Sequence, residues 1–227
     1  IAADFALNEG SVGIRNKEGK HVSLGMQAGE KVYQDFRIEA TNPGGHSSRP
    51  RPDNAIYELA AALVRIGQYE FPVQFNDTTR AYFTETAKLT GGETGAAMTA
   101  LLANPNDAAA NAIVSKDAAF HSMLRTTCVA TLLDAGHANN ALPQRARANI
   151  NCRIIPGETK ASVQAELARV INDPKVSITP EATMRPVATE PTLDPKIVGP
   201  AKALAAKYFP GVPTLPVMST GPTDALL

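Results

Sequence analysis

A histidine in a tightly shaped loop is the first candidate for chemistry in this sequence. His46 stands in "NPGGHSSRP", residues 42–50, between two glycines and two serines. Glycine adopts backbone conformations that strain other residues, so Gly44 and Gly45 predict a sharp turn that fixes the direction of the ring. The histidine is then either a solvated turn residue or a hydrogen-bond donor presented to a developing negative charge, such as an oxyanion.

Two further polar residues have side chains suited to a binding site. Arg153 lies on the polar side of "RARANINCRII", residues 145–155, where apolar and polar residues alternate. A guanidinium group binds a carboxylate through two parallel hydrogen bonds, so Arg153 is suited to anchoring one. A solvated arginine beside Arg145 and Arg147 is an equally good interpretation. Asn140, in "HANNALP", is by composition an ordinary turn residue.

The elements that must position these residues follow a recognisable order. Residues 31–41 alternate as a half-buried strand, and a helix begins after Asp53 or Asn54, either a good N-cap. We expect its buried stripe to be Ile56, Leu59, Ala60, Leu63 and Ile66. Strands at "RTTCVATLLDAG" and "RARANINCRII", a helix in "PGETKASVQAELARVIND" and a strand at "KVSIT" follow. Strand, helix, strand, strand, helix, strand is the ferredoxin-like βαββαβ pattern, and it spans residues 30–180.

The remaining residues predict an α/β protein with a second, discontinuous domain. Residues 71–120 are rich in alanine and turn residues, which predicts short helices inserted into the ferredoxin-like domain. Residues 1–29 and 181–227, with a helix near 195–208, would form part of the domain into which residues 30–180 are inserted. Both ends of the chain look cut, so we expect a piece of a longer protein.

Charge and composition exclude some classes of partner. The chain has 22 basic and 22 acidic residues, and 44% of its residues are hydrophobic. This balance predicts no binding to nucleic acid or to an anionic membrane, and no apolar run is long enough to span a bilayer. Cys128 and Cys152 lie in strand-like stretches, which favours buried packing residues; a disulfide is possible but not indicated. The compartment, cytoplasmic or secreted and periplasmic, stays open.

Five short motifs in a particular order resemble a known family. They are "DFALNEGS", "GGHSSRP", "NNALP", "NCRIIPGET" and "STGPTDALL". Their order is similar to the second half of the co-catalytic zinc amidohydrolases: aminoacylase, carboxypeptidase G, carboxypeptidase S and succinyl-diaminopimelate desuccinylase. The resemblance implies an α/β zinc-binding catalytic domain interrupted by a ferredoxin-like lid that forms a homodimer. It also implies hydrolysis of an amide next to a free carboxylate, in a peptide or an N-acyl amino acid, with two zinc ions in the complete enzyme.

The resemblance assigns roles to residues that match these motifs. Asp4 matches a zinc ligand, with Glu9 in a supporting role, and His46 matches a histidine that reaches the partner's active site and donates to the oxyanion. Asn140 matches a contact to substrate or oxyanion, and Arg153 matches an arginine that binds the substrate carboxylate. Thr223 and Asp224 match a turn that holds the substrate, although Pro222 removes one backbone donor there.

Several family features have no counterpart within the 227 residues. The other zinc ligands and the catalytic glutamate would precede Ile1 or follow Leu227, and His21, His121 and His137 match no motif, which favours surface or packing roles. The alternative function is therefore a catalytically incomplete fragment that acts as a dimerisation or lid module. A free-standing ferredoxin-like regulatory domain is the third possibility, but it leaves the first and last motifs unexplained.

Overall fold

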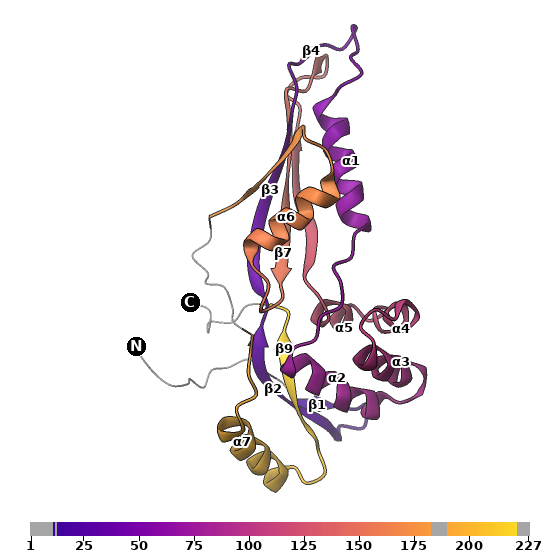
Figure 1. Ribbon diagram of the computed structural model, residues 1–227, viewed down its shortest axis with the longest axis vertical. Helices are drawn as coiled ribbons and strands as arrows, with labels where there is room; N and C mark the ends of the chain where they lie inside the picture. The colour runs from indigo at the N-terminus through magenta and orange to yellow at the C-terminus, as the bar shows by residue number, and fades with distance from the viewer. Residues whose placement is uncertain (1–10, 12, 183–189, 222–227) are drawn as a thin grey trace.

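The chain forms a long sheet-and-helix body above a second, smaller sheet (Figure 1). The computed structural model describes residues 11, 13–182 and 190–221. The long axis of the molecule follows β3 (Val32–Thr41) and β7 (Arg145–Ile154), each ten residues long. Asp4, Glu9, Pro222, Thr223 and Asp224 lie outside the described residues.

The larger sheet is ferredoxin-like, as the order of elements predicts. Its strands are β5 (Thr127–Ala135), β7, β3 and β8 (Val176–Pro180), in that spatial order, and every neighbouring pair is antiparallel. Helices α1 (Ala55–Gln68) and α6 (Lys160–Ile171) cover one face. We refer to these six elements as the lid.

The lid core forms between the two helices and alternate residues of the central strands. Phe36 and Ile38 of β3 and Ile150 of β7 are fully buried there. Asn54 caps α1, accepting a hydrogen bond from the N–H of Ile56 at 2.9 Å, as one of the two predicted caps does. The predicted stripe of α1 is partly wrong, because the helix is rotated. Its buried residues are Ala55, Leu59, Ala62 and Ile66, whereas Ile56 and Ala60 are exposed.

The inserted segment between α1 and β5 forms four short helices with a core of their own. They are α2 (Asp77–Thr90), α3 (Gly92–Ala103), α4 (Ala108–Val114) and α5 (Ala118–Met123). Phe83, Met98 and Leu101 are central to this core. The rings of Phe75, Phe83 and Phe120 meet edge to face, an arrangement that aromatic quadrupoles favour. The helical insertion predicted from composition is therefore present.

The residues before and after the lid meet in a second sheet. It contains β1 (Gly13–Arg15), β2 (His21–Glu30) and β9 (Thr214–Ser219), and β2 pairs with β9 in parallel. Helix α7 (Pro195–Tyr208) precedes β9, at the place predicted for a helix. A parallel pair formed by segments almost 190 residues apart is the pattern expected when one domain is inserted into another. The exact division at residues 29/30 and 180/181 stays a prediction.

The two cysteines form a disulfide, which the sequence left open and did not favour. Cys128 of β5 lies directly opposite Cys152 of β7, and their sulfur atoms are 2.04 Å apart. The two cysteines are 24 residues apart in the sequence, and the register of β5 against β7 places them directly opposite each other. Alternation within each strand does not reveal that register. Within the described residues, no helix is both long and apolar enough to cross a bilayer.

Candidate functional site

His46 and Asn140 lie together at the far end of the lid, beyond the ends of β3 and β7. Strand β4 (Gly45–His46) pairs with β6 (Ala141–Leu142), which places His46 opposite Ala141. The N–H of Ser47 donates to the carbonyl oxygen of Asn140 at 2.9 Å. Two loops nearly 100 residues apart are joined in this way into one tip, at the top of Figure 1.

The two glycines before His46 are required by the shape of the tip. Gly44 has a φ of 80° and Gly45 a φ of 149°, values that glycine adopts far more readily than other residues. A Cβ atom on Gly44 would lie 2.7 Å from Cγ of Gln144, too close for any real side chain. The sequence therefore specifies a backbone that turns sharply just before the histidine.

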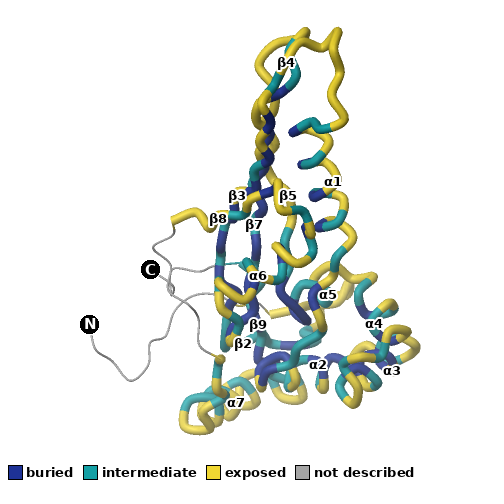
Figure 2. Tube along the Cα trace, turned by 45° about the horizontal axis from the view of Figure 1, so that its top comes forward, coloured by how far each residue is buried: buried dark blue, intermediate teal, exposed yellow. Residues whose placement is uncertain are grey.

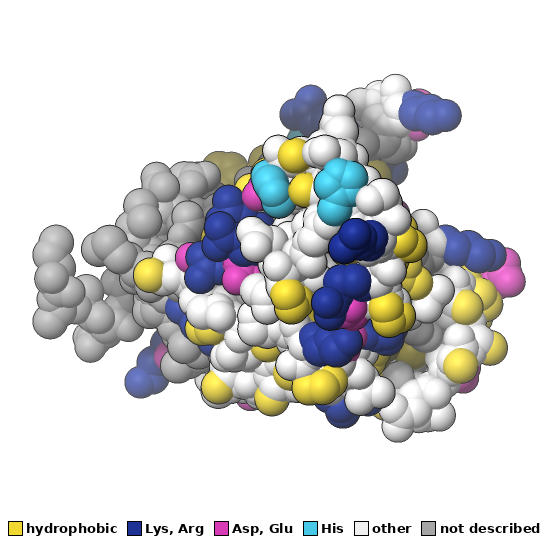
Figure 3. Space-filling view, turned by 90° about the horizontal axis from the view of Figure 1, so that it is seen from above, with side chains coloured by type: hydrophobic (Ala, Val, Ile, Leu, Met, Phe, Trp, Pro, Cys, Tyr) yellow, Lys and Arg dark blue, Asp and Glu magenta, His cyan; other side chains and the backbone are white. Residues whose placement is uncertain are grey.

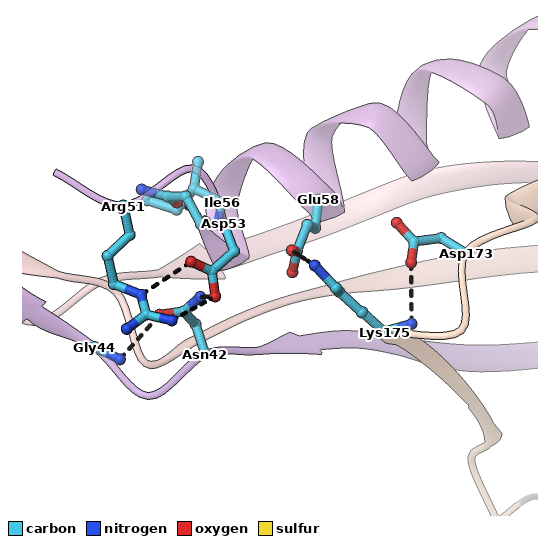
Figure 4. A network of polar contacts seen from close by, with 9 residues as sticks. Asn42, Gly44, Arg51, Asp53, Ile56, Glu58, Asp173 and Lys175 are labelled. Carbon is cyan, nitrogen blue, oxygen red and sulfur yellow. Dashed lines mark hydrogen bonds and ion pairs between the residues drawn. The ribbon is translucent and has the colours of Figure 1, made fainter.

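The base of the His46 loop is closed by a network of charged and amide groups (Figure 4). Asn42 accepts from the N–H of Gly44 at 2.9 Å and donates to Asp53, also at 2.9 Å. Arg51 binds Asp53 through two hydrogen bonds, of 2.9 and 3.0 Å. Hydrogen bonds from Arg51 lower the pKa of Asp53 to about 2, so Asp53 is ionised at neutral pH. The loop is fixed at its base while its tip stays exposed.

The hydrogen bonds of the His46 ring determine which nitrogen can donate. The backbone N–H of Ser48 donates to Nδ1 at 3.2 Å, and the Ser48 hydroxyl lies 2.7 Å from the same nitrogen. An Nδ1 that accepts from a backbone N–H carries no proton in the neutral ring, so the proton is on Nε2. His46 is exposed, and Figure 3 shows histidines beside basic side chains at this end of the molecule. The ring is thus arranged as an outward-pointing donor.

Arg153 differs from the other arginines on the helix-free face of the lid sheet. The others in the described residues pair with carboxylates: Arg37 with Glu181 (3.3 Å), Arg145 with Glu39 (3.9 Å) and Arg147 with Asp134 (3.2 Å). Arg153 has no carboxylate partner there; its guanidinium carbon lies 4.8 Å from the centre of the Tyr33 ring. Its Nη1 is buried without a hydrogen-bond partner in the described residues. Within the described residues, Arg153 is therefore the one arginine of this face without a carboxylate partner, and its role in binding a carboxylate stays a prediction.

His46 and Arg153 cannot serve the same site within one chain. His46 lies at the tip, just beyond the Arg145 end of β7, and Arg153 is near the opposite end of that strand. A strand rises about 3.3 Å per residue, so the eight steps from Arg145 to Arg153 separate the two positions by about 26 Å. A site that uses both residues must therefore combine two subunits.

Asp35 and its partners form a polar cluster next to Arg153 that the sequence did not single out. Asp35 of β3 accepts hydrogen bonds from the side-chain amides of Asn149 and Asn151 and from the Tyr33 hydroxyl. All of these side chains lie on the helix-free face. Alternation indicates that face, but only the register of β3 against β7 brings the residues into contact.

Lys31 is a second group that the sequence did not indicate, buried where the chain passes from β2 to β3. It is 0% exposed, and its Nζ donates to the carbonyl oxygens of Ser122 and Arg125 at 2.9 and 2.8 Å and to the Thr127 hydroxyl at 3.0 Å. Burial lowers the pKa of Lys31 to about 7, helped by the charge of Arg153. The ammonium joins α5 and β5 to the base of the lid.

This burial predicts a pH dependence of stability. Between the folded pKa of about 7 and the ordinary value of 10.5, the unfolded chain holds a proton that the folded chain has released. The free energy of unfolding should then rise with pH across this range, by at most about 1.4 kcal/mol per pH unit. Urea unfolding of the wild type and of Lys31→Met at pH 7, 8 and 9 tests this. The wild type should gain unfolding free energy relative to Lys31→Met as the pH rises. A difference between the two proteins that does not change with pH would contradict the lowered pKa of Lys31.

The described residues do not hold a zinc site. They contain no group of three or more histidine, cysteine, aspartate or glutamate side chains arranged to hold a metal ion. Asp4, the predicted ligand, lies outside them, as do Thr223 and Asp224. The roles of these three residues therefore stay predictions.

The other histidines have ordinary environments, in agreement with the surface or packing roles expected of them. His21 packs edge-on against Phe209 and accepts a hydrogen bond from Arg15 at 3.1 Å. His121 is partly buried, and burial lowers its pKa. His137 is exposed.

The fold and the tip together define a class of protein: a ferredoxin-like lid, placed in the sequence between two strands of a second sheet, that presents a histidine far from its own base. The chain belongs to the M20 peptidase dimerisation domain family, whose model matches residues 28–179. It is 27% identical over 197 residues to a probable carboxypeptidase S-like protein of Dictyostelium discoideum, covering 86% of this chain and 37% of that protein.

A second curated relative and two solved structures are also similar to this chain. An N-fatty-acyl-amino acid synthase/hydrolase of Homo sapiens is 27% identical over 201 residues, covering 86% of this chain and 39% of that protein. The chain thus spans less than half the length of these relatives. An M20 metallo-carboxypeptidase from Sulfolobus solfataricus has a TM-score of 0.53 at 16% identity, covering 93% of this chain and 56% of that one. Human carnosine dipeptidase 1 has a TM-score of 0.50 at 13% identity, covering 88% and 45%. These two structures support the fold.

Proposed function

We propose that this chain is the lid and part of the catalytic domain of a zinc-dependent hydrolase. Its substrate would be an amide next to a free carboxylate, in a peptide or an N-acyl amino acid. The observation that carries the proposal is Arg153, whose guanidinium group lacks a carboxylate partner in the described residues while the other arginines on its face each have one. A guanidinium left unneutralised is suited to an anionic ligand.

The proposed reaction divides the work between two subunits. Arg153 binds the substrate carboxylate and so fixes the position of the neighbouring amide. The Nε2–H of His46 from the partner subunit donates to the oxygen of the scissile carbonyl as negative charge develops on it. Asn140, joined to the same tip, contacts that oxygen or the substrate beside it. Asp4 and ligands from the rest of the full-length protein would hold the zinc. The zinc would in turn activate a water molecule for attack on the amide.

The activity is tested with the full-length protein and matched pairs of substrates. One set contains N-acyl amino acids and dipeptides with a free carboxylate, and the other contains the same compounds with a carboxamide in its place. The proposal predicts hydrolysis of the first set, loss of activity on chelation, recovery with Zn²⁺, and a strong preference for the free acids. Equal hydrolysis of acids and carboxamides would refute the role of the carboxylate. Absence of hydrolysis in both sets would leave the lid-module alternative as the working function.

A second copy of the chain is the partner that we propose for the exposed edge of the lid sheet. Strand β5 is an edge strand, and it exposes Val129, Leu132 and Leu133 by 57 to 70%. A long exposed edge offers unpaired N–H and C=O groups that stable proteins usually cover. Helix α1 exposes Tyr57 and Val64. It lies beside β5, and much of its length is exposed in Figure 2. We call β5 and the outward side of α1 the dimer face.

Charge on the dimer face should separate the subunits. Leu133→Asp combined with Leu132→Asp places two carboxylates where the second copy would pack, and burying unpaired charge is strongly unfavourable. Light scattering coupled to size exclusion should show the mass fall from a dimer to a monomer. Leu204→Asp is the matched control, because Leu204 is 58% exposed on α7, outside this face. A dimeric double variant would exclude this interface.

A further inference from the structure

A carboxylate of the same protein that pairs with an arginine competes with a substrate carboxylate for the guanidinium group. Arg153 has a neighbouring carboxylate. Its register partner on β3 is Tyr33, and Asp35 is two residues further along β3, on the same helix-free face. The two groups do not form an ion pair, although Arg153 influences the titration of Asp35 electrostatically. Asp35 forms its hydrogen bonds with other side chains instead.

Three donors use the oxygens of Asp35. Oδ1 accepts from Asn149 Nδ2 at 2.9 Å and from Asn151 Nδ2 at 2.8 Å, and Oδ2 accepts from the Tyr33 hydroxyl. Burial raises the pKa of Asp35, but these hydrogen bonds, together with the charge of Arg153, outweigh it and leave the pKa below its usual value. Asp35 is therefore an ionised carboxylate at neutral pH whose hydrogen-bonding capacity is directed away from Arg153.

The donors are themselves held in place. Asn149 uses its amide twice, because Nδ2 also donates to the Thr131 hydroxyl on β5 at 2.8 Å. Tyr33 connects the two charges: its hydroxyl binds Asp35, while the guanidinium carbon of Arg153 lies 4.8 Å from the centre of its ring. A guanidinium over an aromatic face is attracted to it without losing its N–H donors. The Tyr33 ring thus orients Arg153, while the cluster engages Asp35, the neighbouring carboxylate that could otherwise pair with it.

We propose that Tyr33, Asn149 and Asn151 are positioning residues that restrain Asp35, so that Arg153 stays available to the carboxylate of the substrate. This inference depends on the proposed role of Arg153. Without the restraint, Asp35 would act as an internal competitor, pairing with Arg153 as Asp134 does with Arg147 on the same face. The substrate carboxylate would then have to displace it.

The restraint is tested in the full-length enzyme with Asn151→Leu, which keeps the size of the side chain and removes the donor. The substrate is the N-acyl amino acid that the wild type hydrolyses best, with its carboxamide for comparison. KM for the acid should rise on the order of fivefold, the scale of one partly exposed ion pair, with kcat little changed. KM for the carboxamide should stay the same. Asn149→Leu should act in the same direction.

The decisive variant is the double change Asn151→Leu with Asp35→Asn. Removing the charge of Asp35 removes the competitor, so KM for the acid should return to the wild-type value, and Asp35→Asn alone should not raise it. A purely structural role of Asn151 would not be rescued in this way. Failure of rescue, or a rise in KM for Asp35→Asn alone, would overturn the inference. The proposed function fails separately, if Arg153→Ala leaves KM for the acid unchanged.

Discussion

Replacing His46 by alanine in the full-length protein is expected to lower kcat by about 100-fold or more, with little change in KM. The reason is that this hydrogen bond is stronger in the transition state than in the bound substrate. A donor aimed at an oxyanion binds the transition state more strongly than the ground state, so its loss appears in kcat. The tip is built for such a donor, because the N–H of Ser48 occupies Nδ1 and leaves the proton on Nε2.

Steady-state kinetics on an N-acyl amino acid measure this effect. His137→Ala is the matched control: His137 is exposed, as His46 is, and it matches no motif, so its kcat should not change. Gly44→Ala should resemble His46→Ala, since a Cβ atom there would lie 2.7 Å from Cγ of Gln144 and displace the tip. An unchanged kcat for His46→Ala would exclude the histidine from the reaction.

Replacing Arg153 by alanine should have the second large effect, on KM for substrates with a free carboxylate. Two charge-assisted hydrogen bonds contribute about 3 kcal/mol together, so KM should rise by about 100-fold. Carboxamide substrates make no such pair, and their KM should change much less. Lysine at this position should restore only part of the affinity, because a point charge does not reproduce the planar fork.

Arg147→Ala is the control for Arg153. It removes an arginine from the same strand and the same face, but one that is already paired with Asp134 at 3.2 Å. Its KM values should stay near those of the wild type. Equal effects of the two substitutions would mean that the general positive charge of the face, and not Arg153, attracts the substrate.

The strands and helices of the lid could be predicted from the sequence because the local residue patterns and the order of elements indicate the same fold. Alternation in residues 31–41 and 145–155, with a cap at Asn54, leads directly to β3, β7 and α1. The phase of the α1 stripe was wrong at Ile56 and Ala60, because a helix with many alanines offers two nearly equivalent apolar sides and packing decides between them.

The features that could not be predicted from the sequence are contacts between strands, which depend on which strands are neighbours. The Cys128–Cys152 disulfide and the cluster around Asp35 both require the registers of β5 and β3 against β7, which no single strand contains. Lys31 is similar, since its acceptors are about 90 residues away along the chain. His46 and Asn140 were predicted as separate motif positions, and their meeting at one tip is a result of the β4–β6 pairing.

We propose that one active site combines Arg153 of one subunit with His46 of the other. Co-expression of His46→Ala and Arg153→Ala chains with different tags yields a heterodimer that can be purified and assayed. In that dimer one site keeps both residues and the other has neither. At a substrate concentration well below the wild-type KM, where a raised KM also lowers the rate, its activity should be about half that of the wild type, although each variant homodimer is nearly inactive. Activity no higher than that of the homodimers would place both residues in the same subunit's site and contradict the account.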